Sequence, residues 1–305
     1  MLKACSFLPA VTQMIYDMGL ESHLYGVTFE CPPIALKEKT PVVRCTLEGK
    51  VYSSMEIDRI FSASKHKGEP LYYVDNEVLE HISPDVIFTQ DICDVCQIDT
   101  ECTAAAVALL EKRPEIISIT PSSLEDVFSS AIVVAAALGK EEKAYRYLEG
   151  LHKRLDGIVE SLLDKKIRSK EVLLLEWIDP LYNCGHWIPH QIGYAGGRDK
   201  LSNPSGDSGR LDWQHILDYD PEVIVVAPCG FGIDRSLEEI GLLTNRPGWK
   251  DLRAVRSGSV FLANFELFTQ SSAGTLVDGI QLLSALFHPD AMQVPQHLER
   301  SCRKL

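Results

Sequence analysis

The sequence predicts an α/β protein of two Rossmann-like lobes, each with a parallel sheet, joined by one long rigid helix. Two observations predict this class. First, VLEHISPDVIFTQDIC (78–93) and HILDYDPEVIVVAPCG (215–230) share one pattern, with Pro84 and Pro221 standing 137 positions apart. In both, a helix end leads through proline and an acid into a β-branched apolar run, which is typical of a buried parallel strand. Second, the segment 139–170 between them is charged, lacks proline and has helical periodicity.

The first lobe is expected over residues 1–138. Residues 2–19 fit a strand, a loop with proline and a helix that closes at Gly19. Residues 171–197 repeat that order, and their helix closes at Gly196 and Gly197. This second repeated pattern is offset by 177 positions instead of 137. The first lobe therefore contains additional residues, near 27–70.

A single connecting helix is expected over residues 139–170. Its apolar positions recur at a spacing of three to four, which predicts one apolar stripe. These positions are Tyr147, Leu151, Leu155, Ile158, Leu162 and Leu163. At 1.5 Å per residue such a helix is on the order of 40 Å long, and it is far stiffer than a flexible linker. The second lobe is expected over 171–289, and residues 290–305 are expected to be a loose tail.

The composition narrows the function classes. Acidic residues number 43 and basic residues 30, which gives a net charge of −13. A surface this acidic repels phosphate backbones, so we expect no nucleic-acid partner. The apolar runs fall short of the roughly 18 residues that a membrane-spanning helix needs, so we expect no membrane insertion.

The beginning of the chain and its cysteines bear on the compartment. A secretory signal needs a run of roughly 7–15 apolar residues, and Pro9, Thr12 and Asp17 interrupt any such run here. Nine cysteines are an odd number at no regular spacing, which fits reduced thiols better than a disulfide framework. We therefore expect a cytoplasmic protein. The alternative is an extracytoplasmic protein whose signal has been removed.

Two α/β lobes leave a ligand cleft between the carboxyl ends of their strands, lined by the loops that follow those strands. These loops are expected at residues 6–12, 28–34, 89–97, 120–123, 177–191, 228–235 and 264–274. The segment 177–190 reads WIDPLYNCGHWIPH and is the richest in aromatic side chains. Such a loop fits a surface for a flat or large ligand. The alternative is that Trp177 and Trp187 cap the core of the second lobe.

Several motifs carry a resemblance to a known family. They are SFLPAVTQMIYDMGL near the start, SPDVIFTQ, DPEVIVVAPCG, RPGW (246–249), GSVFLAN (258–264) and the helix between the lobes. Over residues 1–289 the chain resembles the cobalamin and iron-siderophore class of ABC-transporter substrate-binding proteins, with the class III periplasmic-binding-protein fold. FECPP (29–33), SSMEID (53–58), TQDICDVC (89–96) and LEWIDP…GHWIP (175–189) are similar to its signal-less cobalamin-binding branch.

The resemblance implies a binding protein, not an enzyme, with a cobalamin-like corrinoid or related metal chelate as its ligand and no covalent cofactor. The expected ligand-binding residues are Pro9, Glu30, Asp91, Trp177, Asp179, His186, Trp187, Phe231 and Phe268. The branch carries an Arg-Pro-Gly-Pro-Arg segment before its last helix, whereas this chain has FTQSSAG at 268–274, which leaves the ligand's identity open. In transporter-linked relatives one carboxylate per lobe meets the permease, and the resemblance makes Glu77 and either Glu238 or Glu239 the candidates for that role here.

A rival hypothesis is a metal-handling protein or enzyme that uses Cys31, Cys93, Cys96 and His186. One Cys-x-x-Cys pair is half of the usual structural zinc set, and Asp91 and Asp94 beside it disfavour a reactive thiolate. The sequence contains neither a Walker loop nor a Gly-x-Ser-x-Gly elbow. Small thiols that pack in loops are therefore the favoured interpretation of these cysteines.

Overall fold

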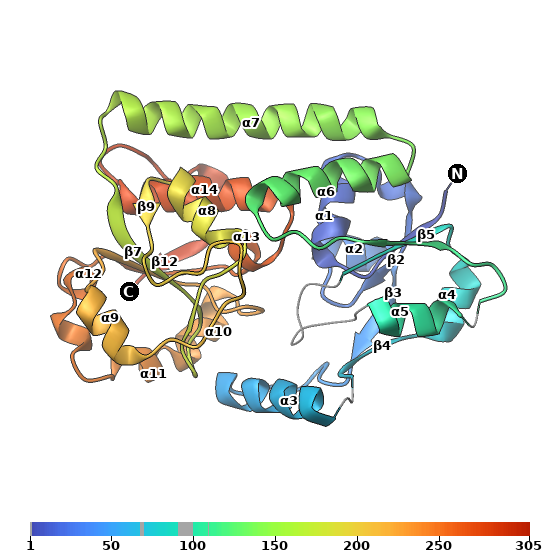
Figure 1. Ribbon diagram of the computed structural model, residues 1–305, viewed down its shortest axis with the longest axis horizontal. Coiled ribbons are helices and arrows are strands. Elements are labelled where there is room, and N and C mark those ends of the chain that lie inside the picture. The colour runs from blue at the N-terminus through green and yellow to red at the C-terminus, as the bar shows by residue number, and fades with distance from the viewer. Residues whose placement is uncertain (1, 68–69, 91–99, 109) are drawn as a thin grey trace. The chain divides into compact units, whose positions relative to one another are not determined.

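The computed structural model describes residues 2–67, 70–90, 100–108 and 110–305, and Figure 1 labels its elements. The chain forms two compact units. The first consists of Met1–Tyr52, Glu56–Pro121 and Glu125–Glu149, and the second of Ser53–Met55, Ser122–Leu124 and Gly150–Leu305. Each unit is built on a mostly parallel sheet, which confirms the predicted α/β class with two lobes.

The first unit contains a six-stranded sheet of order β4-β3-β2-β1-β5-β6. Its strands are β1 (Ala4–Ser6), β2 (Leu24–Thr28), β3 (Thr40–Cys45), β4 (Tyr72–Val74), β5 (Val86–Thr89) and β6 (Glu115–Ser118). All pairs are parallel except β3 with β4. The helices are α1 (Pro9–Asp17), α2 (Pro33–Glu38), α3 (Ser54–Lys67), α4 (Asn76–Ile82), α5 (Thr100–Val107) and α6 (Leu124–Ala137). A core that includes Ile87 packs one face of the sheet against Leu79 of α4 and Val107 of α5.

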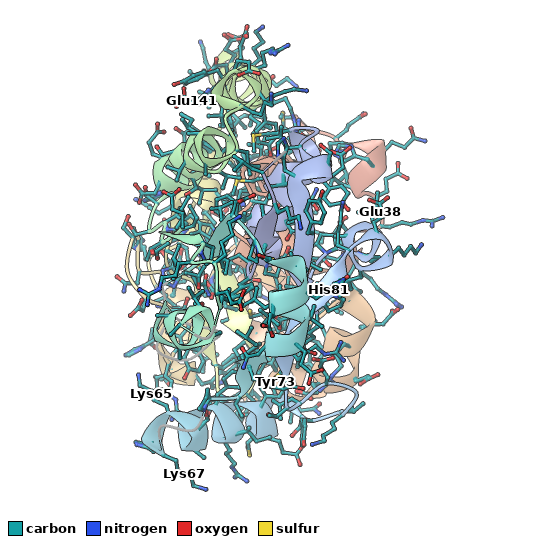
Figure 2. The ribbon with its side chains drawn as sticks, turned by 90° about the vertical axis from the view of Figure 1, so that its right-hand side faces the viewer. Glu38, Lys65, Lys67, Tyr73, His81 and Glu141 are labelled. Carbon is teal, nitrogen blue, oxygen red and sulfur yellow. The ribbon has the colours of Figure 1, made fainter. Side chains whose placement is uncertain are left out.

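The edge strand β4 of this sheet is short. Strand β4 has three residues, and the side chain of Tyr73 at its centre is exposed (Figure 2). Helix α3 precedes this strand and ends on basic side chains, among them Lys65 and Lys67, which suit the negative end of a helix dipole. A short edge strand limits pairing with other chains.

The second unit contains a sheet of order β12-β11-β10-β7-β8, with β9 paired to β7. Its strands are β7 (Lys170–Trp177), β8 (Tyr182–Asn183), β9 (Gly197–Arg198), β10 (Val223–Val226), β11 (Val260–Ala263) and β12 (Cys302–Lys304). The helices are α8 (Ile188–Tyr194), α9 (Trp213–Tyr219), α10 (Ile233–Glu239), α11 (Gly241–Thr244), α12 (Arg253–Arg256), α13 (Glu266–Thr269) and α14 (Ala273–Phe287). Alternate strand residues such as Leu173, Ile224 and Leu262 face one core together with residues of α9, α11 and α12. Helices α8 and α14 pack against each other (Figure 1).

The repeated sequence pattern corresponds to a repeated local structure. Helix α4 ends on Ser83 and helix α9 ends on Asp220, and both residues have left-handed backbone conformations, with φ of 48° and 44°. Pro84 and Pro221 follow, and strands β5 and β10 begin two residues later. The predicted helix–proline–strand units are therefore both present.

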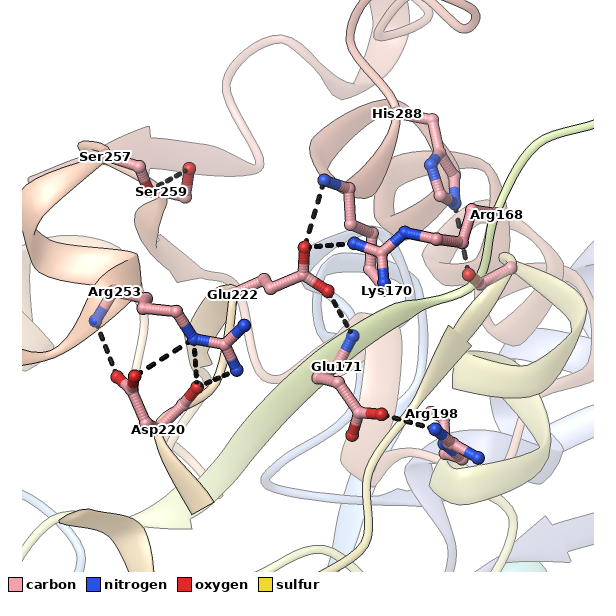
Figure 3. Close-up of polar contacts among 11 residues, drawn as sticks. Arg168, Lys170, Glu171, Arg198, Asp220, Glu222, Arg253, Ser257, Ser259 and His288 are labelled. Atoms are coloured by element: carbon pink, nitrogen blue, oxygen red, sulfur yellow. Dashed lines mark hydrogen bonds and ion pairs between the residues drawn. The ribbon is translucent and has the colours of Figure 1, made fainter. Parts of the chain in front are cut away.

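The acid after each proline stabilises the start of the neighbouring strand. Lys3 donates its backbone N–H to the Asp85 carboxylate at 2.7 Å. Glu171 likewise donates its backbone N–H to the Glu222 carboxylate at 3.0 Å, as Figure 3 shows. Basic side chains then neutralise both acids, and these are Lys112 for Asp85 and Arg168 with Lys170 for Glu222. Each carboxylate therefore accepts hydrogen bonds from a backbone amide and from a cation. These contacts hold the starts of β1 and β7 in place, at the amino end of each sheet.

The segment predicted as the connecting helix forms one continuous helix, α7 (Glu141–Asp164), of 24 residues. Its buried side chains lie at the predicted spacing of three to four, and they include Leu148, Leu151, Leu155 and Ile158. The helix begins in the first unit and continues in the second. Its action as a rigid strut stays a prediction.

The loose tail predicted for residues 290–305 is wrong where Cys302–Lys304 forms strand β12. This strand pairs antiparallel with β11, with Ala263 opposite Cys302, and Leu298 just before it is 3% exposed. Three residues are too few to show the alternation that identifies a strand. The strand forms because the open edge of β11 offers backbone partners, and the sequence of the tail alone does not reveal that edge.

Among the described residues, no helix combines the length and the apolar character needed to cross a bilayer.

Candidate functional site

In the first unit, Pro9 starts the helix that follows β1. Proline suits the first helical position because its missing N–H would have no partner there. The buried Ser6 hydroxyl, at the end of β1, donates to the Leu8 carbonyl at 2.8 Å and fixes the turn before Pro9. The predicted ligand residue Pro9 therefore lies at the carboxyl end of a central strand.

Glu30 follows strand β2 in the same unit. The Tyr72 hydroxyl donates to its carboxylate at 3.4 Å. Although the residue as a whole is exposed, its carboxyl group is desolvated by the surrounding protein. This desolvation raises the pKa of Glu30 to about 7, against the opposing hydrogen bond from Tyr72. A carboxyl group that titrates near neutral pH can either donate or accept a hydrogen bond to a ligand.

The cysteines of the rival metal hypothesis are only partly described. Cys31 is buried, and its thiol donates to the Thr12 hydroxyl at 3.1 Å. Burial raises the pKa of Cys31 to about 12, so the group stays a thiol rather than the thiolate that binds metals. Asp91, Cys93 and Cys96 lie outside the described residues. Within the part of the chain that is described, no three His, Cys, Asp or Glu side chains converge on a metal position.

In the second unit, Trp177, Phe231 and Arg235 form a contiguous group, named here the aromatic cluster. Trp177 ends β7, and Phe231 lies in the loop after β10, the strand parallel to it. Their ring centroids are 5.0 Å apart, and the Arg235 guanidinium lies 4.5 Å from the Phe231 centroid. Sequence reasoning missed Arg235, although it ends the predicted loop 228–235 and is the only cation in it.

Asp179 positions the exposed end of this cluster. Its backbone carbonyl accepts the indole N–H of Trp177 at 3.2 Å, and its carboxylate lies 3.9 Å from Arg246. Trp177 is partly buried, whereas Phe231 is 5% exposed. Trp177 is therefore the aromatic side chain of the cluster with the more accessible surface.

The remaining predicted residues of this unit form a second group around Trp187. Trp187 is 5% exposed and donates its indole N–H to the carbonyl of the fully buried Phe268 at 2.6 Å. The alternative considered for Trp187, a place in the core of the second lobe, is therefore what the structure describes. Contact of Trp187 and Phe268 with a ligand stays a prediction.

His186 precedes Trp187 with a left-handed backbone, at φ 51°, and its ring lies 5.5 Å from the indole. Desolvation lowers the pKa of His186, and Asp207, 3.9 Å away, opposes that shift. The ring is thus mainly neutral at pH 7, which leaves a nitrogen able to accept a hydrogen bond. No sequence signal pointed to Asp207, because it lies 21 positions away in an irregular loop.

The three carboxylates predicted to meet a permease differ in accessibility. Glu77 is exposed in the first turn of α4, and the Glu238 side chain is 66% exposed. The Glu239 side chain is only 10% exposed and pairs with Arg235. Glu238 is therefore the better placed of the two alternatives.

Comparison with known families gives one match. The model of the family described as "Periplasmic binding protein" matches residues 74–267. The matched residues include β5, the connecting helix α7, Trp177 and Phe231. A search of curated proteins finds no match.

Solved structures with the same fold come from several bacteria. A periplasmic binding protein from Veillonella parvula has a TM-score of 0.71 at 18% identity, covering 94% of this chain and 91% of that one. A periplasmic heme-binding protein from Roseiflexus sp. RS-1 has a TM-score of 0.69 at 17% identity, covering 95% and 99%. A periplasmic vitamin B12 binding protein of Vibrio cholerae has a TM-score of 0.62 at 14% identity, covering 94% and 96%. At these identities the likeness shows a common fold.

Proposed function

Because the chain belongs to the periplasmic binding protein family, we propose that it is a binding protein for a corrinoid or a related metal chelate. Members of the family bind small molecules and are not enzymes. Two solved structures of the same fold are described as binding heme and vitamin B12, both of which are large, ring-shaped metal chelates. This class of ligand is consistent with the residues found at the strand ends.

The aromatic cluster is the observation that carries the proposal. Trp177 is partly exposed and offers apolar ring surface on which a macrocycle can pack, while the buried Phe231 supports it from below and carries the Arg235 guanidinium over its ring. The cluster stands at the carboxyl ends of β7 and β10, where α/β sheets bind their ligands. Asp179 and His186 supply polar groups that can fix a ligand's orientation.

We predict that Trp177→Ala weakens ligand binding several-fold. A ring stacked on an aromatic side chain contributes about 0.5–1.5 kcal/mol beyond area burial, which corresponds to a factor of about 2–13. The measurement is calorimetric titration with cobalamin, cobinamide, haem and a ferric chelate. Tyr194→Ala is the matched control because Tyr194 is an exposed aromatic residue of the same unit. Absence of binding by every probe would refute the proposed function, and equal affinities of wild type and Trp177→Ala would exclude this surface.

For the compartment we propose the cytoplasm, where the protein would carry or sense its ligand. Four thiols, Cys5, Cys31, Cys45 and Cys184, are buried and free, a state that a reducing compartment maintains. The alternative is an exported protein that delivers its ligand to an ABC permease. In that case Glu77 and Glu238 would contact the permease arginines, because both side chains are exposed.

A thiol count distinguishes these two proposals. We expect nine free thiols per chain in protein purified without reductant, handled under argon and denatured before labelling, because the chain has nine cysteines. Seven thiols without metal would indicate one disulfide and favour the exported alternative. Nine thiols together with stoichiometric zinc or iron in the native protein would revive the metal hypothesis for Cys31, Cys93 and Cys96, because denaturation releases a bound metal and exposes its thiolates to the label.

A further inference from the structure

The second unit holds a pocket that the aromatic cluster does not fill. Its volume is about 490 Å³, and the residues that carry charge or hydrogen-bonding amides in its lining are Asp234, Arg235, Asn264, Arg300 and Arg303. A volume of this size accommodates an organic group rather than a single ion. Arg235 belongs both to this pocket and to the aromatic cluster, so the two features adjoin.

The pocket's lining comes from distant parts of the sequence that the sheet brings together. Asp234 and Arg235 lie in α10, and Asn264 follows β11. Strand β12 pairs with β11, and Asn264 donates its backbone N–H to the Ser301 carbonyl at 3.0 Å. This pairing fixes Arg300 and Arg303 beside the carboxyl end of β11, at the same end of the sheet as Phe231.

The pocket carries an excess of positive charge. Arg235 is already paired with Glu238 and Glu239. Arg300 and Arg303 are exposed, and within the described residues no carboxylate forms an ion pair with either of them. Asp234 is the one acid of the lining, so two guanidinium groups face one carboxylate in a protein whose net charge is −13.

We propose that this pocket binds a carboxylate or phosphate group, held by Arg300 and Arg303 with Asn264 as an additional donor. Guanidinium groups recognise both anions through paired N–H donors, and charge-assisted hydrogen bonds of this kind are the strong ones. Resting on the proposed function, the anion is an arm of the bound chelate, whose ring packs on the neighbouring aromatic cluster. A free organic anion has the same chemistry, and the experiment distinguishes the two sources.

The test compares wild type with Arg300→Gln/Arg303→Gln, and uses Arg256→Gln as the matched control. Arg256 is an exposed arginine of the same unit that does not line the pocket. The probes are two pairs: haem with its dimethyl ester, which differ in their free carboxylates, and cobalamin with cobinamide, which lacks the nucleotide loop that carries the phosphate. Citrate is the free anion. Melting temperatures of all three proteins verify folding, since exposed arginines contribute little to stability.

We expect wild type and Arg256→Gln to bind the anionic member of at least one pair tenfold or more tightly than its partner, and the double variant to lose that preference. Equal preferences in the double variant and wild type would overturn the proposed anion binding by this pocket while leaving the proposed function intact. Absence of binding by every chelate would refute the proposed function instead. In that case citrate binding tests the pocket alone. Citrate binding to wild type that disappears in the double variant supports a free-anion site, whereas absence of citrate binding to wild type overturns the inference.

Discussion

Trp187→Ala should lower the free energy of unfolding by about 3–5 kcal/mol, as expected for removal of a buried large aromatic side chain. The indole of Trp187 is 5% exposed, and its N–H donates to the Phe268 carbonyl at 2.6 Å. The substitution would therefore leave a cavity and also an unpaired buried carbonyl. Urea unfolding followed by circular dichroism measures the loss.

Two further variants separate these contributions. Trp187→Phe keeps most of the ring and removes the N–H, so we expect about 1–2 kcal/mol of destabilisation. Trp177→Ala removes a partly exposed ring and should cost less than Trp187→Ala. A Trp187→Ala protein as stable as wild type but impaired in ligand binding would show that Trp187 acts as a ligand contact and not as part of the core.

Asp199 should make the stability of the second unit depend on pH. Its carboxylate accepts the backbone N–H groups of Leu174 at 3.0 Å and Leu201 at 2.9 Å. Desolvation nevertheless raises the pKa of Asp199 from 3.8 to about 6. Between these values the folded protein holds a proton that the unfolded chain has released. The contribution of Asp199 to stability is therefore largest below pH 4 and falls as the pH rises towards 6.

The free energy of unfolding of Asp199→Asn, taken relative to that of wild type, should rise by about 2 kcal/mol from pH 4 to pH 7. Each pKa unit corresponds to 1.36 kcal/mol. Acids with lowered pKa values, such as Asp85, are present in both proteins and cancel in the difference. Urea unfolding at several pH values measures it. Asp251→Asn is the matched control because Asp251 is exposed. A difference of the same size in that control would show that Asp199 is not its source.

The sequence was most informative where structure is encoded locally. Pro84 and Pro221 mark both strand starts because proline and the acid after it act on their immediate neighbours. Helix α7 was predictable because its apolar stripe repeats over many turns. Strand β12 was not, because its partner β11 lies about 40 positions earlier and only the folded sheet brings them together.

The candidate site was predictable in its loops but not in its side-chain contacts. Trp177 and Phe231 were named from the loops that follow two strands, and they do meet. Composition alone could not tell which tryptophan of 177–190 would be buried, because an irregular loop has no periodicity to indicate an inner face. Arg235 was missed for a related reason: its contact with Phe231 arises from the first turn of a short helix.

Strand β12 follows every other strand of its sheet in chain order, which has a consequence during synthesis on the ribosome. Until residues 302–304 have emerged, β11 is an open edge whose backbone donors and acceptors can pair with any extended segment nearby. The arginines at 300 and 303 take their places only when that edge closes. The nascent second unit therefore keeps one open sheet edge until β12 pairs, and the charged pocket is the last feature of its sheet to assemble.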